Sequence, residues 1–542
     1  MPFQQELAVG ESTWSSMLRH RASERPQVAA STQSDREAKK MSRMNLVFFS
    51  TALLLVSAAV ATAFLLFARS PRQPHIVFIL ADDLGWNDVS YHGCPQIRTP
   101  NIDALAWNGV RLSRYYTQAL CTPSRSTLMT GRYPIHTGTC VQIPCFFDIQ
   151  NRCVSPSLWC WVLASFIMNH PPRLFFFFFF YTLTTKPGSQ RRLSARNTPC
   201  DIFTAPTPGE SERPGLDFRR DLSIFNESGT YVTQLLTREA AAVIEQHPID
   251  KPLFLYLAHQ APHSADSHDR LQVPKEYIDQ YRDIGSRNRT LYAGMVSALD
   301  ESVGVVFESL NRRGMLSDTV IVFSSDNGGD IESANANFAS AWPLKGQKYT
   351  AWEGGVHAPA IIWSPLFSGL LGSTYDNLFH ISDWLPTLYQ LAGGLPADMA
   401  GDIDGFSHFD SLTRGTERPR SELLINIDPV ENYSAIIEDN FKLVKGLAFG
   451  GVSDKWYQIP GNVTWDSDTP RDQCESSVVV RVLKNLGLSP VCGAGGTRYA
   501  SPVDCGERDP SKVCASGTSP CLFDLSRDPC EYNDISGQHP EV

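Results

Sequence analysis

The chain has 542 residues, of which 42% are hydrophobic, so it is long enough to bury a large core and to form more than one domain. Its 57 acidic and 47 basic side chains give a formal net charge of -10, which excludes a general nucleic-acid-binding protein, because binding phosphate requires a basic face. Six of the 13 cysteines lie between Cys474 and Cys530, which indicates an oxidising compartment and a tail held by disulfides. Sequons for N-glycosylation agree with this compartment and lie at Asn226, Asn288, Asn432 and Asn462.

The N-terminal part of the chain predicts a route into the secretory pathway. Residues 1–45 are polar and without periodicity, which is typical of a disordered leader. Residues 46–67 contain no charged side chain and are flanked by Arg43 and Arg69, so this run of 22 residues is long enough to span a bilayer. It is a transmembrane anchor if translation starts at Met1, and a long signal peptide if translation starts at Met41 or Met44. Both alternatives place the rest of the chain in the lumen, in lysosomes or outside the cell, either free or as a single-pass membrane protein.

Three apolar runs, at residues 75–80, 252–257 and 319–323, predict buried parallel strands. Helices are expected between them, at residues 99–109, 231–245 and 291–310. This alternation predicts an α/β domain with a largely parallel sheet flanked by helices, over residues 74–420. Polar residues follow each strand, namely Asp82 and Asp83, His263, and Asp326 and Asn327. Because ligands of parallel sheets bind beyond the carboxyl ends of the strands, we expect these residues to form one site.

Residues 139–215 form an anomalous insert in which neither helical nor strand periodicity is recognisable. Six consecutive phenylalanines at residues 175–180 follow an apolar piece at residues 158–168, and a Pro-Pro-Arg sequence separates the two. These apolar pieces are too short to cross a membrane. An unrelated loop is one alternative. Our preferred hypothesis is a mistranslated segment, because the pyrimidine-rich stretch before a splice acceptor would encode phenylalanine.

The composition changes near residue 421. Short strand-like segments are followed by sequence rich in cysteine, glycine and proline, so residues 421–542 are expected to form a smaller antiparallel β domain.

The most specific motif of the chain begins at Cys121 and reads Cys-Thr-Pro-Ser-Arg, ending at Thr130 and Gly131. Its spacing predicts the start of a helix, whose unpaired backbone N–H groups suit an anion. The motif is similar to the signature of the sulfatase family, and residues 75–86 and 132–138 around it resemble enzymes of the arylsulfatase B type. Residues 521–533 resemble the hairpin near the C-terminus of such enzymes, and the terminal helix that usually follows is expected to be missing, which makes the C-terminal domain truncated.

The resemblance implies an alkaline-phosphatase-like fold and a formylglycine made from Cys121, whose hydrate attacks the sulfur of a sulfate ester. It implies a formylglycine-generating enzyme as a partner, and sulfated carbohydrates such as glycosaminoglycans, or aryl sulfates, as substrates. Arg125 matches the arginine that orients the hydrate, and His263 and Lys348 match substrate-binding residues. The family places Ca²⁺ on residues that here are Asp82, Asp83, Asp326, Asn327 and the modified Cys121. Oxygen ligands of this kind suit calcium.

One departure from the family is expected to matter. Sulfatases of this type carry a second signature, Gly-Lys-Trp-His-Leu-Gly, whose lysine binds sulfate and whose histidine is an acid or base, and this chain lacks that string. Its expected place is within residues 139–215. The alternative function is therefore a catalytically impaired, sulfatase-like protein that binds glycans. A phosphatase or phosphodiesterase of the same superfamily is disfavoured, because such enzymes usually present serine or threonine in place of Cys121.

Overall fold

The computed structural model describes residues 73–139, 231–463, 469–493 and 503–540, apart from short gaps at 95, 266–269, 368, 400 and 417, together with a few short segments elsewhere. Residues 72–542 form one compact unit, and residues 1–71 form another. The predicted leader and the apolar run at residues 46–67 lie outside the described residues, except for Met41 and Thr51. Within the described part of the chain, no helix has the length and hydropathy needed to cross a membrane.

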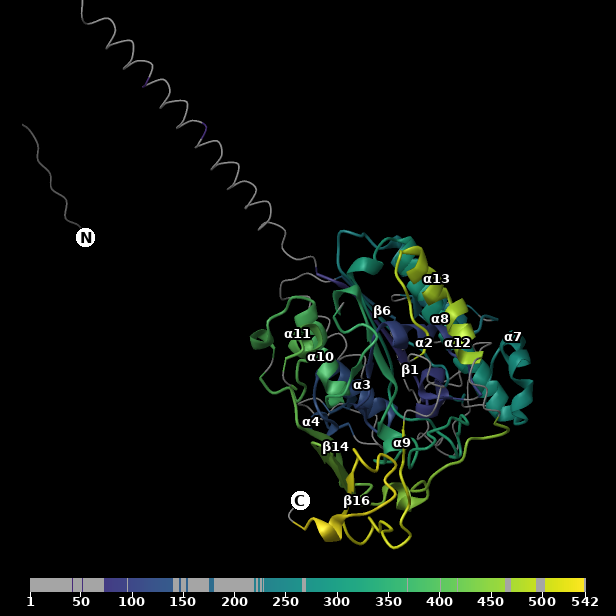
Figure 1. The fold of residues 1–542 in the computed structure, drawn as a ribbon, viewed down its shortest axis with the longest axis vertical. Coiled ribbons are helices and arrows are strands. Elements are labelled where there is room, and N and C mark those ends of the chain that lie inside the picture. Colours follow the sequence, from purple (N-terminus) through teal and green to yellow (C-terminus); the bar gives the residue numbers. More distant parts are fainter. Residues whose placement is uncertain are drawn as a thin grey trace, which may run out of the picture. The chain divides into compact units, whose positions relative to one another are not determined.

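A seven-stranded sheet forms the centre of the larger unit (Figure 1). Strand β1 (His75–Ala81) lies between β9 (Leu253–Ala258) and β10 (Thr319–Ser325) and is parallel to both. These are the three predicted strands, and apolar side chains on both faces suit a sheet that is covered on both sides. The remaining strands are β11 (Ala360–Trp363), β2 (Val110–Leu112) and β12 (Thr374–Tyr375) beyond β10, and β6 (Phe175–Phe179) beyond β9.

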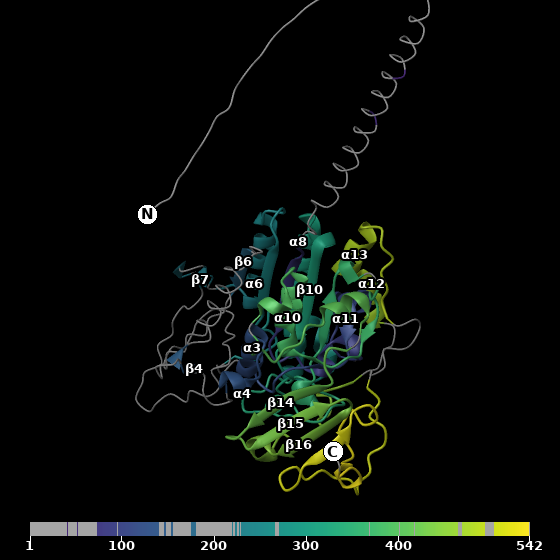
Figure 2. The same ribbon diagram turned by 90° about the vertical axis from the view of Figure 1, so that its left-hand side faces the viewer.

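Helices cover both faces of the sheet (Figure 2). Alternate residues of β1 belong to the cores of the two layers. Val77 and Ile79 belong to the core shared with the helices of one face, whereas Phe78 and Leu80 belong to the core on the other. This alternation follows from the two-residue repeat of a strand. The first layer comprises α2 (Pro100–Asn108), α6 (Val232–Gln246) and α8 (Arg287–Arg312), and the second comprises α3 (Cys121–Thr130), α10 (Trp384–Leu391) and α11 (Phe409–Arg414). Shorter helices are α4 (Pro134–Thr137), α7 (Lys275–Ile278) and α9 (Glu353–Val356).

The expected C-terminal antiparallel sheet is present. It has four strands, β14 (Glu422–Asp428), β15 (Tyr433–Glu438), β16 (Phe441–Gly446) and β17 (Cys521–Asp524), each antiparallel to its neighbour. The resemblance to a hairpin at residues 521–533 holds only in part, because β17 pairs with β16 and no second strand follows within residues 525–533. The disulfides Cys474–Cys492, Cys505–Cys530 and Cys514–Cys521 hold this tail, as expected.

The C-terminal segment also contains two helices beside its antiparallel sheet. Residues 469–493 form α12 (Thr469–Ser476) and α13 (Val478–Asn485), which pack in the helical layer against α2 and α8 (Figure 1). Val479 and Leu483 of α13 are buried there. Because this helix buries an apolar face on the α/β body, the C-terminal segment contributes to both cores.

The anomalous insert contains short strands, although its sequence shows no recognisable strand periodicity. Five of its consecutive phenylalanines form β6, which is parallel to β9 with Phe175 opposite Leu253. A parallel strand within a sheet does not require alternating polarity, which explains why periodicity gave no signal there. Two short antiparallel pairs occur nearby, β4 (Phe146–Phe147) with β5 (Cys153–Val154) and β7 (Arg219–Arg220) with β8 (Ser223–Ile224). Most of the remaining insert lies outside the described residues.

Candidate functional site

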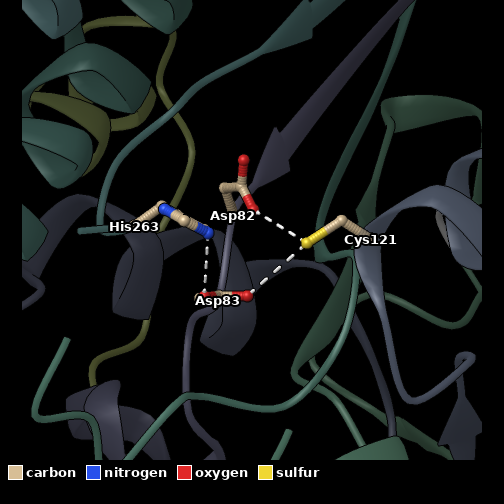
Figure 3. A group of neighbouring side chains, drawn as sticks. All are labelled: Asp82, Asp83, Cys121 and His263. Carbon is tan, nitrogen blue, oxygen red and sulfur yellow. Dashed lines mark hydrogen bonds and ion pairs between the residues drawn. The ribbon is translucent and has the colours of Figure 1, made fainter. Parts of the chain in front are cut away.

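The polar residues that follow the three central strands meet at one edge of the sheet, as the sequence predicts. Ligand atoms of Asp82, Asp83, Cys121 and His263 all lie within 4.8 Å of one another, and all four residues are buried (Figure 3). They come from the ends of β1 and β9 and from the first residue of α3. This proximity requires the fold, because the residues are distant in the sequence.

Cys121 is the first residue of α3, so the predicted helix start is confirmed. Its thiol sulfur lies 3.4 Å from Oδ1 of Asp82 and 3.7 Å from Oδ1 of Asp83. Figure 3 shows the thiol directed at both carboxylates. The side chain is 3% exposed, so the position is nearly closed to bulk water. A reactive group at this position would face a cluster of oxygens within a buried site.

Asp83 has a left-handed backbone, with φ of 62°, which a non-glycine residue adopts only when its surroundings enforce it. Its N–H donates to Oδ1 of Asp326 at 3.2 Å. The side chain of Asn337 donates to the carbonyl of Asp83 at 3.0 Å and also to that of Pro262 at 3.0 Å. Asn337 therefore joins the segments after β1 and β9. Sequence reasoning missed this role, because no local pattern marks a side chain that supports two distant backbones.

Arg125 lies one turn after Cys121 and binds carboxylates of the cluster. Its Nη2 atom is 3.0 Å from Asp82 Oδ2 and 2.7 Å from Asp326 Oδ2, and its Nε donates to the same Asp326 oxygen at 2.9 Å. Burial opposes the charged form of Arg125, but Asp82 and Asp326 outweigh it and raise its pKa well above the usual value. The guanidinium therefore joins two carboxylates that follow adjacent strands.

Lys348 and His263 lie beside Asp83. Nζ of Lys348 is 2.6 Å from Asp83 Oδ2, and Nε2 of His263 is 3.4 Å from the same oxygen. Nδ1 of His263 lies 2.6 Å from the carbonyl oxygen of Ser264, which can only accept a hydrogen bond, so Nδ1 carries the proton of the neutral ring. Nε2 then accepts from Lys348 Nζ at 3.3 Å. These two predicted substrate-binding residues therefore lie in the same cluster as Cys121.

Asn327 provides a direct test of whether the cluster fits a metal ion. Its amide nitrogen donates to Asp83 Oδ1 at 2.6 Å and to the carbonyl of Gly328 at 2.8 Å. Its oxygen Oδ1 is buried and has no hydrogen-bond partner among the described residues. A buried acceptor without a donor is costly, and a bound cation would satisfy it. Together with the carboxylates of Asp82, Asp83 and Asp326, this oxygen fits a calcium-like ion.

His259 lies near this site in the sequence, but its side chain has another partner. Its Nε2 atom is 2.9 Å from the hydroxyl of Ser302. Burial lowers the pKa of His259 to about 3, so the ring is neutral near pH 7. It therefore has a structural role. Most of the stretch in which the second sulfatase signature was expected lies outside the described residues.

A second buried network joins the C-terminal sheet to the site. Lys442 on β16 lies 2.8 Å from carboxylate oxygens of both Glu353 and Glu531. Glu353 also accepts a hydrogen bond from the hydroxyl of Tyr116 at 3.1 Å, and Tyr116 lies just before the Cys121 motif. Sequence reasoning gave Glu353 no role. A lysine within an amphipathic strand gave no indication that it is fully buried.

Comparison with known proteins gives a consistent result. A protein-family model described as Sulfatase matches residues 74–174 and 177–395. Arylsulfatase J of Mus musculus is 33% identical over 486 residues, covering 87% of this chain and 74% of that protein. N-acetylgalactosamine-6-sulfatase of Mus musculus is 30% identical over 389 residues, covering 67% of this chain and 70% of that protein.

The fold is also found among solved structures. The crystal structure of Ps i-CgsB superposes with a TM-score of 0.58 at 23% sequence identity, covering 86% of this chain and 90% of that chain. At this identity the likeness concerns the fold alone. It agrees with the expected α/β body and the smaller antiparallel sheet.

Proposed function

Because the chain belongs to the sulfatase family and is a sulfuric ester hydrolase, we propose that it hydrolyses sulfate esters of sugars at Cys121, with this residue oxidised to formylglycine and a calcium ion bound beside it. The observation that carries the proposal is the surroundings of the thiol. The sulfur lies 3.4 Å and 3.7 Å from two carboxylate oxygens of a cluster made of hard ligands. A soft sulfur ligand does not suit calcium, whereas the oxygens of an oxidised Cys121 do.

The electrostatics of the cluster support a divalent ion. In the described part of the chain, the three carboxylates of Asp82, Asp83 and Asp326 contact the cationic side chains of Arg125 and Lys348. A divalent ion would change the net charge of these groups from negative to positive. A sulfate ester carries one negative charge, so the loaded site would attract it.

Each residue of this cluster then has a defined task. The oxygens of Asp82, Asp83, Asp326 and Asn327 hold the ion. Arg125 fixes the positions of Asp82 and Asp326 through the contacts described above. Lys348 and His263 bind the ester oxygens from the side of Asp83, where a cation and an imidazole stabilise developing charge. A bound divalent ion would supply polarisation of the sulfuryl oxygens, and Cys121, once oxidised and hydrated, would supply a nucleophilic oxygen.

The substrate class is proposed from the relatives. The name of N-acetylgalactosamine-6-sulfatase says that this relative acts on a sulfated amino sugar. We propose the same class of substrate for the present chain. A closer likeness to the arylsulfatase B type also remains a prediction. The proposal requires a formylglycine-generating enzyme as a partner and a lysosomal, lumenal or extracellular location, reached through residues 46–67.

Mass analysis of the modified residue tests the proposal. The full chain is produced together with a formylglycine-generating enzyme, and the peptides that contain Cys121 and Cys94 are compared. Both cysteines are buried and free of disulfides, so Cys94 is a matched control. We expect an aldehyde at position 121 alone, and no hydrolysis of a sulfated monosaccharide by Cys121→Ala. An intact thiol at position 121 in protein that hydrolyses the ester would refute the proposal.

A further inference from the structure

A cavity of about 600 Å³ lies between the edge of the seven-stranded sheet and the C-terminal sheet. Arg111 on β2 and Arg114 line it from the α/β body, and Asn440 and Leu525 line it from the C-terminal sheet. None of the residues to which the proposed function assigns a role belongs to its described lining. This cavity, here called the aromatic pocket, is therefore a separate feature, and its volume is in the range of small-molecule sites.

One wall of the aromatic pocket is a stack of flat rings. The ring of Trp86 lies between His92 and His357, with ring centroids 3.8 Å and 4.1 Å apart, respectively. Tyr116 continues the stack on His357 at 4.9 Å. Burial lowers the pKa of His92 to about 3, so its ring is uncharged near pH 7. Each of these four residues is at most 8% exposed, so the stack is a rigid, largely apolar wall with little free ring surface.

Two arginines add positive charge to the aromatic pocket. The guanidinium of Arg111 lies over the ring of Trp107, with its carbon 4.6 Å from the centroid. It donates to the carbonyls of Ala106 and Gly372 and to the hydroxyl of Thr374. Because a guanidinium has five N–H donors, these bonds hold its position and leave capacity for an anion. Arg114 donates only to the carbonyl of Asp439 among the bonds described for it.

The charge balance of the pocket favours an anion. Two acidic residues line it, Glu353 and Asp504. Glu353 is paired with Lys442 at 2.8 Å, so Asp504 is the other acid of the described lining, and Asp376 outside the lining also acts on Arg111. The described lining also includes the polar side chains of Asn440 and Ser526, which can form hydrogen bonds with a ligand. A ligand with hydroxyl groups and one anionic group would match this lining.

We propose that the aromatic pocket binds a sulfated sugar unit, at a position separate from the ester held near Cys121. The choice of a sulfated sugar rests on the proposed function, whereas the pocket, its rings and its arginines do not. A sugar ring would lie against the aromatic wall and its sulfate group would bind the arginines. A polymer held at two places has a higher apparent affinity than a single unit, so the pocket would retain long substrates.

Calorimetric titration of the full chain carrying Cys121→Ala tests this proposal, because it measures binding without turnover. The probes are a disaccharide with one sulfate group and the same disaccharide without it. In this background, Arg114→Gln removes a cation and Asn440→Trp fills the pocket from an exposed position. The matched control is Arg527→Gln, which removes the same charge from an 87% exposed side chain adjacent to the pocket-lining Ser526.

We expect the sulfated probe to bind about tenfold more weakly to each pocket variant, which corresponds to about 1.4 kcal/mol, and to bind the control variant unchanged. The unsulfated probe should bind the Cys121→Ala chain no more tightly than the sulfated probe binds the Arg114→Gln variant. Equal affinity of the pocket variants and the control, or no binding by the Cys121→Ala chain, would overturn the proposal. A separate assay with Cys121 intact and a small sulfate ester distinguishes the two proposals. If that assay shows no turnover while the pocket still binds the sulfated probe, the proposed function is refuted and the pocket proposal stands.

Discussion

The thiol sulfur of Cys121 lies 3.4 Å from Oδ1 of Asp82, although 39 residues separate them in the chain. Asp82 follows the central strand β1, and Cys121 starts helix α3, so the fold brings a strand end and a helix start together. The contact places the residue that is proposed to be oxidised against the oxygens that are proposed to hold calcium. The following predictions depend on this arrangement.

Calcium is expected to stabilise the protein against unfolding, because an ion that binds only the folded state shifts the equilibrium. At a concentration 100 times the dissociation constant, the gain is about 2.7 kcal/mol. Chemical denaturation with calcium and with a chelator measures it. Asp326→Asn should abolish the difference, and Asp402→Asn, at a 69% exposed carboxylate, should retain it. An unchanged calcium effect in Asp326→Asn would contradict the proposed ligand set.

Removing the charge of Lys348 should destabilise the protein. Its ammonium is fully buried and lies 2.6 Å from Asp83 Oδ2, so Lys348→Met leaves that carboxylate without its lysine partner. Breaking a buried pair in this way costs about 3–5 kcal/mol. Urea denaturation measures the loss in calcium-free protein. The control is Lys275→Met, in an exposed pair with Asp279, where solvent screening makes the expected loss much smaller. Similar losses in both variants would show that burial does not strengthen this pair.

The buried network around Lys442 predicts a dependence of stability on pH. Burial raises the pKa of Glu531 from 4.5 to about 7, assisted by the neighbouring carboxylate of Glu353 and opposed by Lys442. A carboxyl group with a higher pKa in the folded state binds its proton more tightly there. Its contribution to stability therefore increases as the pH falls from about 7 to 4.5, and is lost as the pH rises through 7.

Glu531→Gln should remove this component, since glutamine cannot titrate. The measurement is the free energy of unfolding at several pH values between 4.5 and 8, compared between wild type and variant. Glu332→Gln, at a 59% exposed side chain, is the matched control and should keep the wild-type profile. A Glu531→Gln profile parallel to that of wild type would contradict the raised pKa.

The missing second signature predicts weak turnover by the chain as it stands. Replacing residues 139–215 with a sulfatase segment that carries Gly-Lys-Trp-His-Leu-Gly should raise the turnover of a sulfated sugar by about 10²–10⁴-fold, the usual contribution of a positioned acid or base. The control is the same replacement with the segment's histidine changed to glutamine, which should show a much smaller gain. If the unaltered chain already matches the repaired one, the impaired alternative is wrong.

Much of the fold could be predicted from short patterns. The apolar runs became β1, β9 and β10 because buried parallel strands require apolar residues on both faces. The helix at Cys121 began at the expected residue. Patterns failed where distant segments decide the outcome. The phenylalanine run became β6 through pairing with β9, and α13 joined the α/β core although its neighbours in sequence belong to the tail.

The sequence by itself determined which side chains are available for the chemistry, because the Cys121 motif and the polar residues after the strands are local patterns. It also determined the order of strands and helices, since hydrophobic periodicity is local. Only the tertiary structure decided that Arg125 pairs with Asp82 and Asp326, that Asn337 supports Asp83, and that Lys442 is buried between two glutamates. These relationships depend on distances between residues far apart in the chain, and such distances exist only after the sheet and its covering layers have packed.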